Sequence, residues 1–236
     1  RAQLDDALAR LVASGLVLER AEEGGRTFSF KHALVQEVAY STLLRSRRLA
    51  LHAQIADAMQ ALVPEIVANQ PEILARHLAE AGLSERAVMA YQRAGRLALS
   101  RSAAREASSH LRRGLDLLAA LPEGRARDHQ ELALLTSFGI ALSAAKGYGD
   151  DGAVSAFERA RALVHRLESR EDIGSVFNGL FILYSNRAEF AKALEVANEF
   201  MALTEGSSDP IVRSTAHRMV AVTHRLMGEI AISRPF

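Results

Sequence analysis

The feature that most constrains the fold of this chain is a change of hydrophobic pattern near residue 31. Residues 27–30, Thr-Phe-Ser-Phe, alternate polar and apolar side chains with the period of a β-strand. Residues 31–44 then place apolar side chains at helical spacing, and no β-rich run reappears afterwards. The chain is therefore expected to join a small strand-bearing segment to a long helical array.

The composition of the 236 residues excludes several classes of function. Cysteine is absent, so disulfides, zinc–thiolate sites and thiol nucleophiles are excluded together. The net charge of +1 comes from 29 basic and 28 acidic residues, which is not the basic field that non-specific nucleic-acid binding needs. No apolar run approaches the roughly 20 residues of a membrane span. We therefore expect a cytoplasmic protein without a nucleic-acid or membrane partner.

Residues 1–45 are typical of the C-terminal part of a winged-helix domain. An amphipathic helix is predicted over residues 4–13, and β-prone residues 16–18 and 27–30 flank a turn at residues 22–25. A helix followed directly by a two-stranded hairpin is how winged-helix domains end.

The predicted first helix also argues against DNA binding, since it is the helix that would enter the major groove. It carries Asp5 and Asp6, and its one basic side chain is Arg10. Two carboxylates at the entering end would repel the phosphates. We therefore reject nucleic acid as the partner of this segment.

Proline and glycine divide the remaining chain into helices. The second helix carries an apolar stripe of Leu51, Ile55, Met59 and Leu62. We assign residues 46–85 to a helical connector and residues 86–236 to a repeat domain truncated at its C-terminus. The predicted helices cover residues 31–44, 46–63, 71–82, 84–100, 103–121, 125–146, 151–168, 171–186, 189–204 and 210–228.

The repeat domain resembles degenerate tetratricopeptide repeats. Such repeats are helical hairpins with large and small residues at fixed positions of the first helix and an Ala-rich stripe on the second. The spacing of Ala107, Ala153 and Ala193 exceeds the usual 34 residues, so the repeats are long, and residues 216–228 would begin a fourth unit. The resemblance implies a mainly α fold, an α-solenoid of tetratricopeptide-like hairpins preceded by a partial winged helix with a small β-hairpin. The matching residues are Tyr91, Ala94, Gly95, Ala98, Ala107, Leu111, Gly114 and Pro122; Leu135, Phe138, Gly139, Leu142, Ala153, Phe157 and Ala160; and Phe177, Leu180, Phe181, Tyr184, Ala193, Ala197 and Phe200.

Three glycines inside predicted helices need a structural reason, because glycine there costs about 1 kcal/mol relative to alanine. For Gly95, Gly114 and Gly139 we expect close approach of the two helices of a hairpin.

Both ends of the chain are interpreted as cuts within a longer polypeptide. Residue 1 is Arg, and the helical register is already established at Leu4. The last helix is expected to need a cover that the chain does not supply, because its apolar positions recur at helical spacing. Those positions are Ala216, Met219, Val220, Thr223 and Met227.

Residues 147–152, Gly-Tyr-Gly-Asp-Asp-Gly, match the dinucleotide fingerprint letter for letter. A dinucleotide loop must follow a buried strand, whereas this one follows a predicted helix. Asp150 and Asp151 would also face the pyrophosphate. We interpret the stretch as a turn in which Asp150 or Asp151 caps the next helix.

No constellation of catalytic or metal-binding residues occurs in the sequence. His217 and His224 share a helix face but lack a third ligand at the spacing of a helical metal site. His32, His52, His77 and His110 stand on separate predicted helices and are interpreted as packing or capping residues. We therefore expect no enzyme activity, no metal and no cofactor for this chain.

Residues 45–48, Arg-Ser-Arg-Arg, are the densest basic cluster. Two interpretations remain open. The cluster binds a phosphate or an acidic partner, or it is a helix junction whose arginines lie near the carbonyl end of the preceding helix.

Residues 28–40, together with Leu43, Leu44 and residues 51–56, resemble the region that follows the nucleotide-binding domain in large bacterial signal-transduction ATPases. The likeness is strongest to those that begin with a class III adenylate/guanylate cyclase domain. Residues 75–82 and 102–111 are also similar to that family. The resemblance implies a parent protein with a cyclase domain, an ATPase domain, a winged-helix domain and a repeat domain that acts as a sensor. In such a parent, ATP and Mg²⁺ would bind only to domains outside this chain.

The leading hypothesis is a non-catalytic sensor or interaction segment that binds a protein, a peptide or a small inducer and contacts the ATPase domain of the same polypeptide. The first helices are expected to line its groove, because amides and arginines suit a peptide backbone or carboxylate. Two alternatives stay open: a fragment of a maltose-regulator-like transcription factor, and an enzyme with the adenylate cyclase activity of its parent. The predicted groove residues are Gln92, Arg96, Thr136, Ser143, Asn178, Ser185, Asn186, His217, His224 and Arg225.

Overall fold

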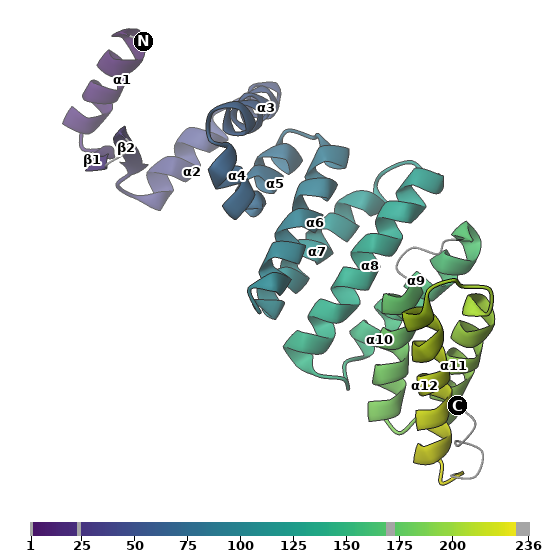
Figure 1. Cartoon of the computed structure of the whole chain (residues 1–236). Helices are drawn as coiled ribbons and strands as arrows, with labels where there is room; N and C mark the ends of the chain where they lie inside the picture. Colours follow the sequence, from purple (N-terminus) through teal and green to yellow (C-terminus); the bar gives the residue numbers. More distant parts are fainter. Residues whose placement is uncertain (1, 23–24, 169–172, 230–236) are drawn as a thin grey trace.

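The computed structural model describes residues 2–22, 25–168 and 173–229. The described part is mainly helical and contains one two-stranded antiparallel sheet (Figure 1). Its elements are α1 (Ala2–Ala13), β1 (Val17–Glu22), β2 (Gly25–Phe30), α2 (Ala33–Ser41), α3 (Arg45–Leu62), α4 (Pro64–Asn69), α5 (Pro71–Glu80), α6 (Ser84–Ser100), α7 (Ala104–Ala119), α8 (Arg125–Lys146), α9 (Asp151–Leu167), α10 (Ile173–Asn186), α11 (Phe190–Thr204) and α12 (Pro210–Leu226).

The elements before α3 form a thin N-terminal module. Strands β1 and β2 pair with Val17 opposite Phe30, α1 packs against β1, and α2 packs against β2. Arg26 of β2 ties α1 to the hairpin through an ion pair with Asp5 at 2.5 Å. Val17 is the one buried hydrophobic residue among the described side chains of this module, so the module has almost no core of its own.

From α5 onward the helices stack into a solenoid, which runs away from the N-terminal module in Figure 1. The pairs α6–α7, α8–α9 and α10–α11 are antiparallel hairpins, and α12 packs on α11. The first helices also touch one another in series, α6 with α8, α8 with α10 and α10 with α12. They therefore form one continuous layer, as the predicted α-solenoid requires.

The core of the solenoid depends on glycines that let large side chains cross between helices. Phe157 of α9 is buried against Gly139 of α8 and Gly179 of α10, where an added Cβ would lie 2.6 Å and 2.5 Å from its ring. Gly95 of α6 meets Leu111 of α7 in the same way. Close approach within a hairpin is thus confirmed for Gly95 and Gly139.

The expectation for Gly114 is correct but incomplete. A Cβ added to this α7 residue would lie 3.5 Å from Tyr91 of α6, within the hairpin, and 3.2 Å from Leu134 of α8, in the next hairpin. The reason is that α7 packs on α8 as well as on α6.

The predicted helix boundaries agree with the structure to within about two residues for most helices. Predicted helix 31–44 is shorter, and ends at Ser41. Residues 64–69 form α4, which was not predicted, because Pro64 was interpreted only as a breaker although proline is well suited to the first position of a helix.

Two expectations about apolar stripes were only partly correct. On α3, Leu51 and Met59 are half-buried, but Ile55 and Leu62 are exposed, and the fully buried residue is Ala56. On α12, the expected lack of a cover is wrong for Ala216, Met219, Val220 and Thr223, which α11 and α10 bury, whereas Met227 is 41% exposed.

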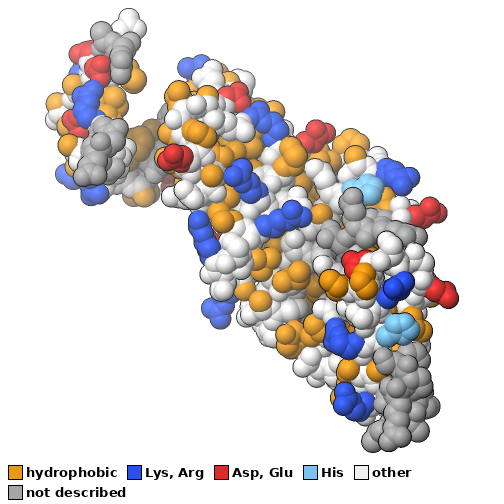
Figure 2. Space-filling model, viewed as in Figure 1, with side chains coloured by type: hydrophobic (Ala, Val, Ile, Leu, Met, Phe, Trp, Pro, Cys, Tyr) orange, Lys and Arg blue, Asp and Glu red, His pale blue; other side chains and the backbone are white. Residues whose placement is uncertain are grey.

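The surface in the view of Figure 2 mixes hydrophobic and basic side chains without one dominant charged area. Within the described residues, no helix combines the length and apolar character that a membrane crossing needs.

Candidate interaction grooves

The ten residues of the predicted groove lie on the first helices α6, α8, α10 and α12, which touch in series. We call this set the first-helix surface. Gln92 and Arg96 are on α6, Thr136 and Ser143 on α8, Asn178, Ser185 and Asn186 on α10, and His217, His224 and Arg225 on α12.

Several polar groups of this surface are already hydrogen-bonded within their own helix. Thr136 is buried and donates to the carbonyl of Leu132, and Ser143 donates to Gly139 at 2.9 Å. Asn186 Nδ2 donates to the carbonyl of Ile182 at 2.8 Å. The exposed side chains Arg96, Asn186 and Arg225 and the half-buried Gln92 and Asn178 keep polar groups at the surface. The buried hydroxyl of Ser185 has no hydrogen-bond partner in the structure.

The α12 members divide between two environments. His217 lines a cavity of about 390 Å³ between α11 and α12, together with Asn198 and Arg213. His224 is half-buried and bonds through Nδ1 to Glu229 at 2.7 Å. Among the described residues, no group of three or more His, Asp and Glu side chains is placed to hold a metal ion.

Residues 147–150 of the Gly-rich stretch form the turn between α8 and α9, and residues 151 and 152 begin α9. Asp150 is the N-cap of α9, and its carboxylate accepts from the backbone N–H of Ala153 at 3.0 Å. This confirms the interpretation as an interhelical turn, with Asp150 as the cap.

The basic cluster 45–48 begins α3 and faces the end of α2. The guanidinium of Arg48 lies 5.2 Å from the ring centroid of Tyr40. Arg45 and Arg48 line a cavity of about 380 Å³ with Tyr40, Glu80 and others. The cluster is therefore part of the junction between the N-terminal module and the solenoid.

His52 and His77 stand on separate helices, as predicted, and meet at this junction. The hydroxyl of Tyr40 lies 3.0 Å from Nε2 of His52, and Nδ1 of His52 lies 2.8 Å from Nδ1 of His77. Two Nδ1 atoms can share one hydrogen bond only if one of them carries the proton and the other does not. Burial, then the neighbouring His52 and Arg76, lower the pKa of His77 from its ordinary value, while Glu80 opposes them.

A large cavity lies between the two helices of the α8–α9 hairpin. It has a volume of about 660 Å³ and is lined by the start of α8 and the second half of α9. A smaller cavity of about 260 Å³ adjoins it between α7, α8 and α9 and shares Arg127, Glu131 and Arg159 with it. We call the two together the α7–α9 groove.

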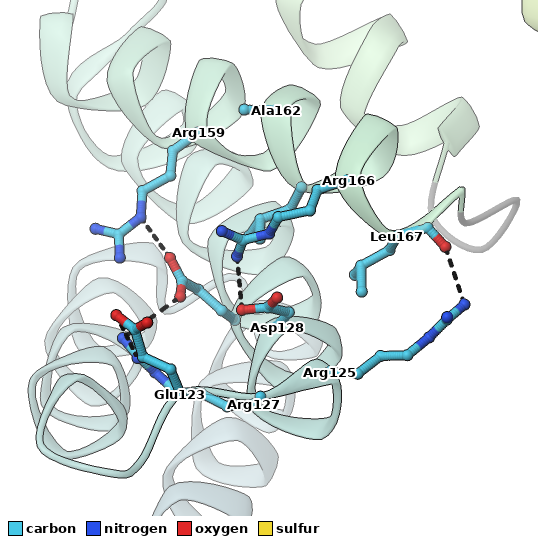
Figure 3. Close-up of a pocket in the computed structure, with 11 residues that line it drawn as sticks. Glu123, Arg125, Arg127, Asp128, Arg159, Ala162, Arg166 and Leu167 are labelled. Carbon is cyan, nitrogen blue, oxygen red and sulfur yellow. Dashed lines mark hydrogen bonds and ion pairs between the residues drawn. The ribbon is translucent and has the colours of Figure 1, made fainter.

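Arginines and carboxylates alternate across this groove (Figure 3). Arg166 of α9 pairs with Asp128 of α8 at 2.6 Å, and Arg159 pairs with Glu131. Arg127 lies 3.9 Å from Glu131, and its buried Nε has no hydrogen-bond partner.

The next pair of second helices, α9 and α11, is joined by ion pairs. Arg161 of α9 bonds to Glu199 and to Glu195 of α11, the latter at 2.8 Å, and His165 bonds to Glu199 at 2.6 Å. Burial favours a raised pKa for Glu199, but the bonds from Arg161 and His165 outweigh it and lower that pKa. Hydrogen bonding to Glu199 is also the main cause that raises the pKa of Arg161.

Sequence reasoning did not find the α7–α9 groove. The available signal was local: Arg159 and Arg166 are seven residues apart on one helix face, and Glu131 directly precedes an apolar run. The ion pairs join residues that are 28 and 38 positions apart in the sequence, and only the packing of α8 on α9 reveals them.

Known proteins resemble this chain in two ways: one protein matches part of its sequence, and several solved structures have a similar fold. No protein-family model matches the chain. The uncharacterized protein R02095 of Rhizobium meliloti (strain 1021) is 30% identical over 166 residues, which are 70% of this chain. The match spans only 16% of the length of that relative.

Three solved structures have similar folds. BtubC (BKLC) from P. vanneervenii superimposes with a TM-score of 0.57 at 14% identity, over 87% of this chain and 88% of that one. The TPR-like repeats of a putative kinesin light chain from Podosopora anserina give a TM-score of 0.58 at 16% identity, over 81% and 92% of the two chains. A single-substitution variant of the same repeats superimposes with a TM-score of 0.59, also at 16% identity, over 81% of this chain and 91% of that one. The chain thus has the fold of tetratricopeptide-like repeat solenoids, a class whose stacked hairpins create extended binding surfaces.

Proposed function

We propose that this chain is the non-catalytic, protein-binding segment of a larger bacterial signalling ATPase, of the kind linked to adenylate cyclase. The observation that carries the proposal is the continuous layer of first helices from α6 to α12. Solenoids of this kind use such a layer to bind a partner. The bacterial relative supports a larger parent, since the match covers 16% of its length.

We also propose that the chain divides into three segments. Residues 1–45 are the end of a winged-helix domain, residues 46–85 a connector and residues 86–236 the repeats. In the N-terminal module Leu34, Val38 and Leu44 are 74%, 62% and 76% exposed. An exposed apolar surface of this kind favours contact with another protein domain. We propose that this domain is the ATPase domain of the same cytoplasmic polypeptide. ATP and Mg²⁺ would bind there, and not to this chain.

The first-helix surface is proposed to hold a peptide or protein segment through directed hydrogen bonds. The half-buried Asn178 and the exposed Asn186 stand two turns apart on α10. An amide side chain can donate to and accept from a peptide backbone at once. A small inducer would use the same groups.

The test is a peptide array probed with the purified chain, followed by titration of the best peptide. We expect Asn178→Ala with Asn186→Ala to weaken binding at least tenfold while the circular dichroism spectrum stays unchanged. Asn69→Ala, at the end of α4 and away from this surface, is the matched control. Equal binding by all three proteins would contradict the proposal, and release of cyclic AMP or phosphate by the chain alone would favour an enzyme instead.

A further inference from the structure

We infer that the α7–α9 groove is a second binding site, which takes an extended acidic peptide segment. It lies between α8 and the second helices α7 and α9, and its lining contains none of the ten residues of the first-helix surface. The inference therefore goes beyond that function and does not depend on it.

The dimensions of the groove favour a peptide over a small anion. Its lining runs along α9 from Gly152 to Leu167, which at 1.5 Å per residue is about 22 Å. An extended chain rises about 3.3 Å per residue, so about seven residues match this length. A lone phosphate or carboxylate would contact only one end of it.

The floor of the groove is apolar. Leu135 and Phe138 of α8 and Leu163 of α9 are almost fully buried and still line the two cavities. Alternate side chains of an extended peptide point to opposite sides, so every second side chain can contact this floor.

The rim of the groove carries more exposed positive than negative charge. The arginines at positions 112, 125, 159 and 166 are exposed, whereas the exposed acids of the lining are Asp116 and Glu123. The other two acids lie deeper, with Asp128 18% and Glu131 6% exposed. An approaching ligand therefore meets more guanidinium groups than carboxylates at the rim.

The buried acids also hold the arginines in place for a ligand. A guanidinium has five N–H donors, and Arg159 and Arg166 each show one ion pair to the deeper carboxylates. Both side chains are still 60% exposed, so donors remain for a ligand carboxylate. Pre-ordered side chains lose less conformational entropy when a ligand binds.

The experiment uses the full chain and a fluorescein-labelled heptapeptide that alternates Glu and Leu, with binding followed by fluorescence anisotropy. We expect Arg159→Glu with Arg166→Glu to weaken binding at least tenfold. The matched control, Arg76→Glu with Arg105→Glu, makes the same charge change at exposed positions outside both surfaces and should stay within twofold of the parent chain. Ala162→Trp fills the cavity without changing its charge and should weaken binding at least fivefold.

The outcomes separate the two sites and the two kinds of ligand. Loss of binding in Asn178→Ala with Asn186→Ala, but not in the groove pair, would place the peptide on the first-helix surface, which overturns this inference and supports the proposed function. An equal loss in the groove pair and in the control pair would show a general charge effect and would also overturn the inference. Equal binding of a heptapeptide that alternates Gln and Leu would overturn the acidic part. Sodium phosphate that displaces the peptide far better than sodium chloride of equal ionic strength would show a small-anion site and overturn the peptide part. No binding of the acidic peptide, or binding by the groove double variant and Ala162→Trp equal to that of the parent chain, would also overturn the inference.

Discussion

The N-terminal module and the solenoid are joined in one chain but are stabilised to very different degrees. In the solenoid, large side chains such as Phe157, Phe177 and Phe200 are fully buried, and two glycines let Phe157 cross between helices. In the module, α1, α2 and the hairpin bury little beyond Val17. Apolar residues are present in both, so hydrophobic content alone does not make a core. What differs is whether a neighbouring helix is placed to cover the apolar face.

The largest effect should come from emptying the crossing point of three helices. Phe157→Ala is expected to lower the free energy of unfolding by about 3–5 kcal/mol, because it removes a buried ring and leaves a cavity between Gly139 and Gly179. Urea unfolding followed by circular dichroism measures this loss. A change below about 1 kcal/mol would mean that this crossing does not stabilise the solenoid.

A slightly smaller effect should follow from overfilling the same place. Gly139→Ala puts a Cβ 2.6 Å from the Phe157 ring and should destabilise the fold by about 1–3 kcal/mol, although alanine favours a helix. Gly174→Ala on α10, where nothing lies within 4 Å of an added Cβ, is the control and should be neutral or stabilising. Equal effects of the two substitutions would contradict the packing argument.

The ion pairs between α9 and α11 should contribute less than the core. Glu199→Gln weakens charged hydrogen bonds from Arg161 and His165, so we expect a loss of about 1–2 kcal/mol at neutral pH. Because the folded state lowers the pKa of Glu199, its stabilising contribution is present above the ordinary glutamate pKa and is lost as the pH falls below it. When the pH is lowered from about 6 to about 3.5, the thermal unfolding midpoint should therefore fall less in the variant than in the parent chain.

Local signals in the sequence were enough to place the helices. Pro71 and Pro210 open helices, Gly147 ends one and Asp150 caps the next, and each of these acts within one turn of chain. These signals, with the small residues Gly95 and Gly139, made the solenoid predictable.

Contacts between distant helices were not predictable from the same signals. The meeting of His52 with His77 and of Glu131 with Arg159 depends on how helices stack, and a charged side chain looks the same in the sequence whether it faces solvent or a neighbour. The cover of α12 by α11 was missed for the same reason.

A small pH effect should appear where the module joins the solenoid. The pKa of His77 is lowered in the folded state, so the unfolded chain binds more protons as the pH falls below about 6.5. Stability should therefore decline between about pH 7.5 and pH 5.5. In His77→Gln that decline should be weaker, as measured by the thermal unfolding midpoint at each pH. An identical pH dependence in both proteins would remove His77 from this account.

The smallest effect should come from the exposed helix of the module. Leu34→Ala with Val38→Ala removes apolar surface that is already in water, so the free energy of unfolding should change by less than about 0.5 kcal/mol. The matched control, Leu180→Ala with Val176→Ala in the fully buried face of α10, should abolish cooperative unfolding or lower the midpoint strongly. A loss of more than about 2 kcal/mol in the module variant would mean that α2 is covered within this chain, in conflict with its exposure and with the proposed contact to an ATPase domain. If the loss is small but the variant no longer binds a separately purified ATPase domain, the apolar face of α2 acts in binding and not in folding.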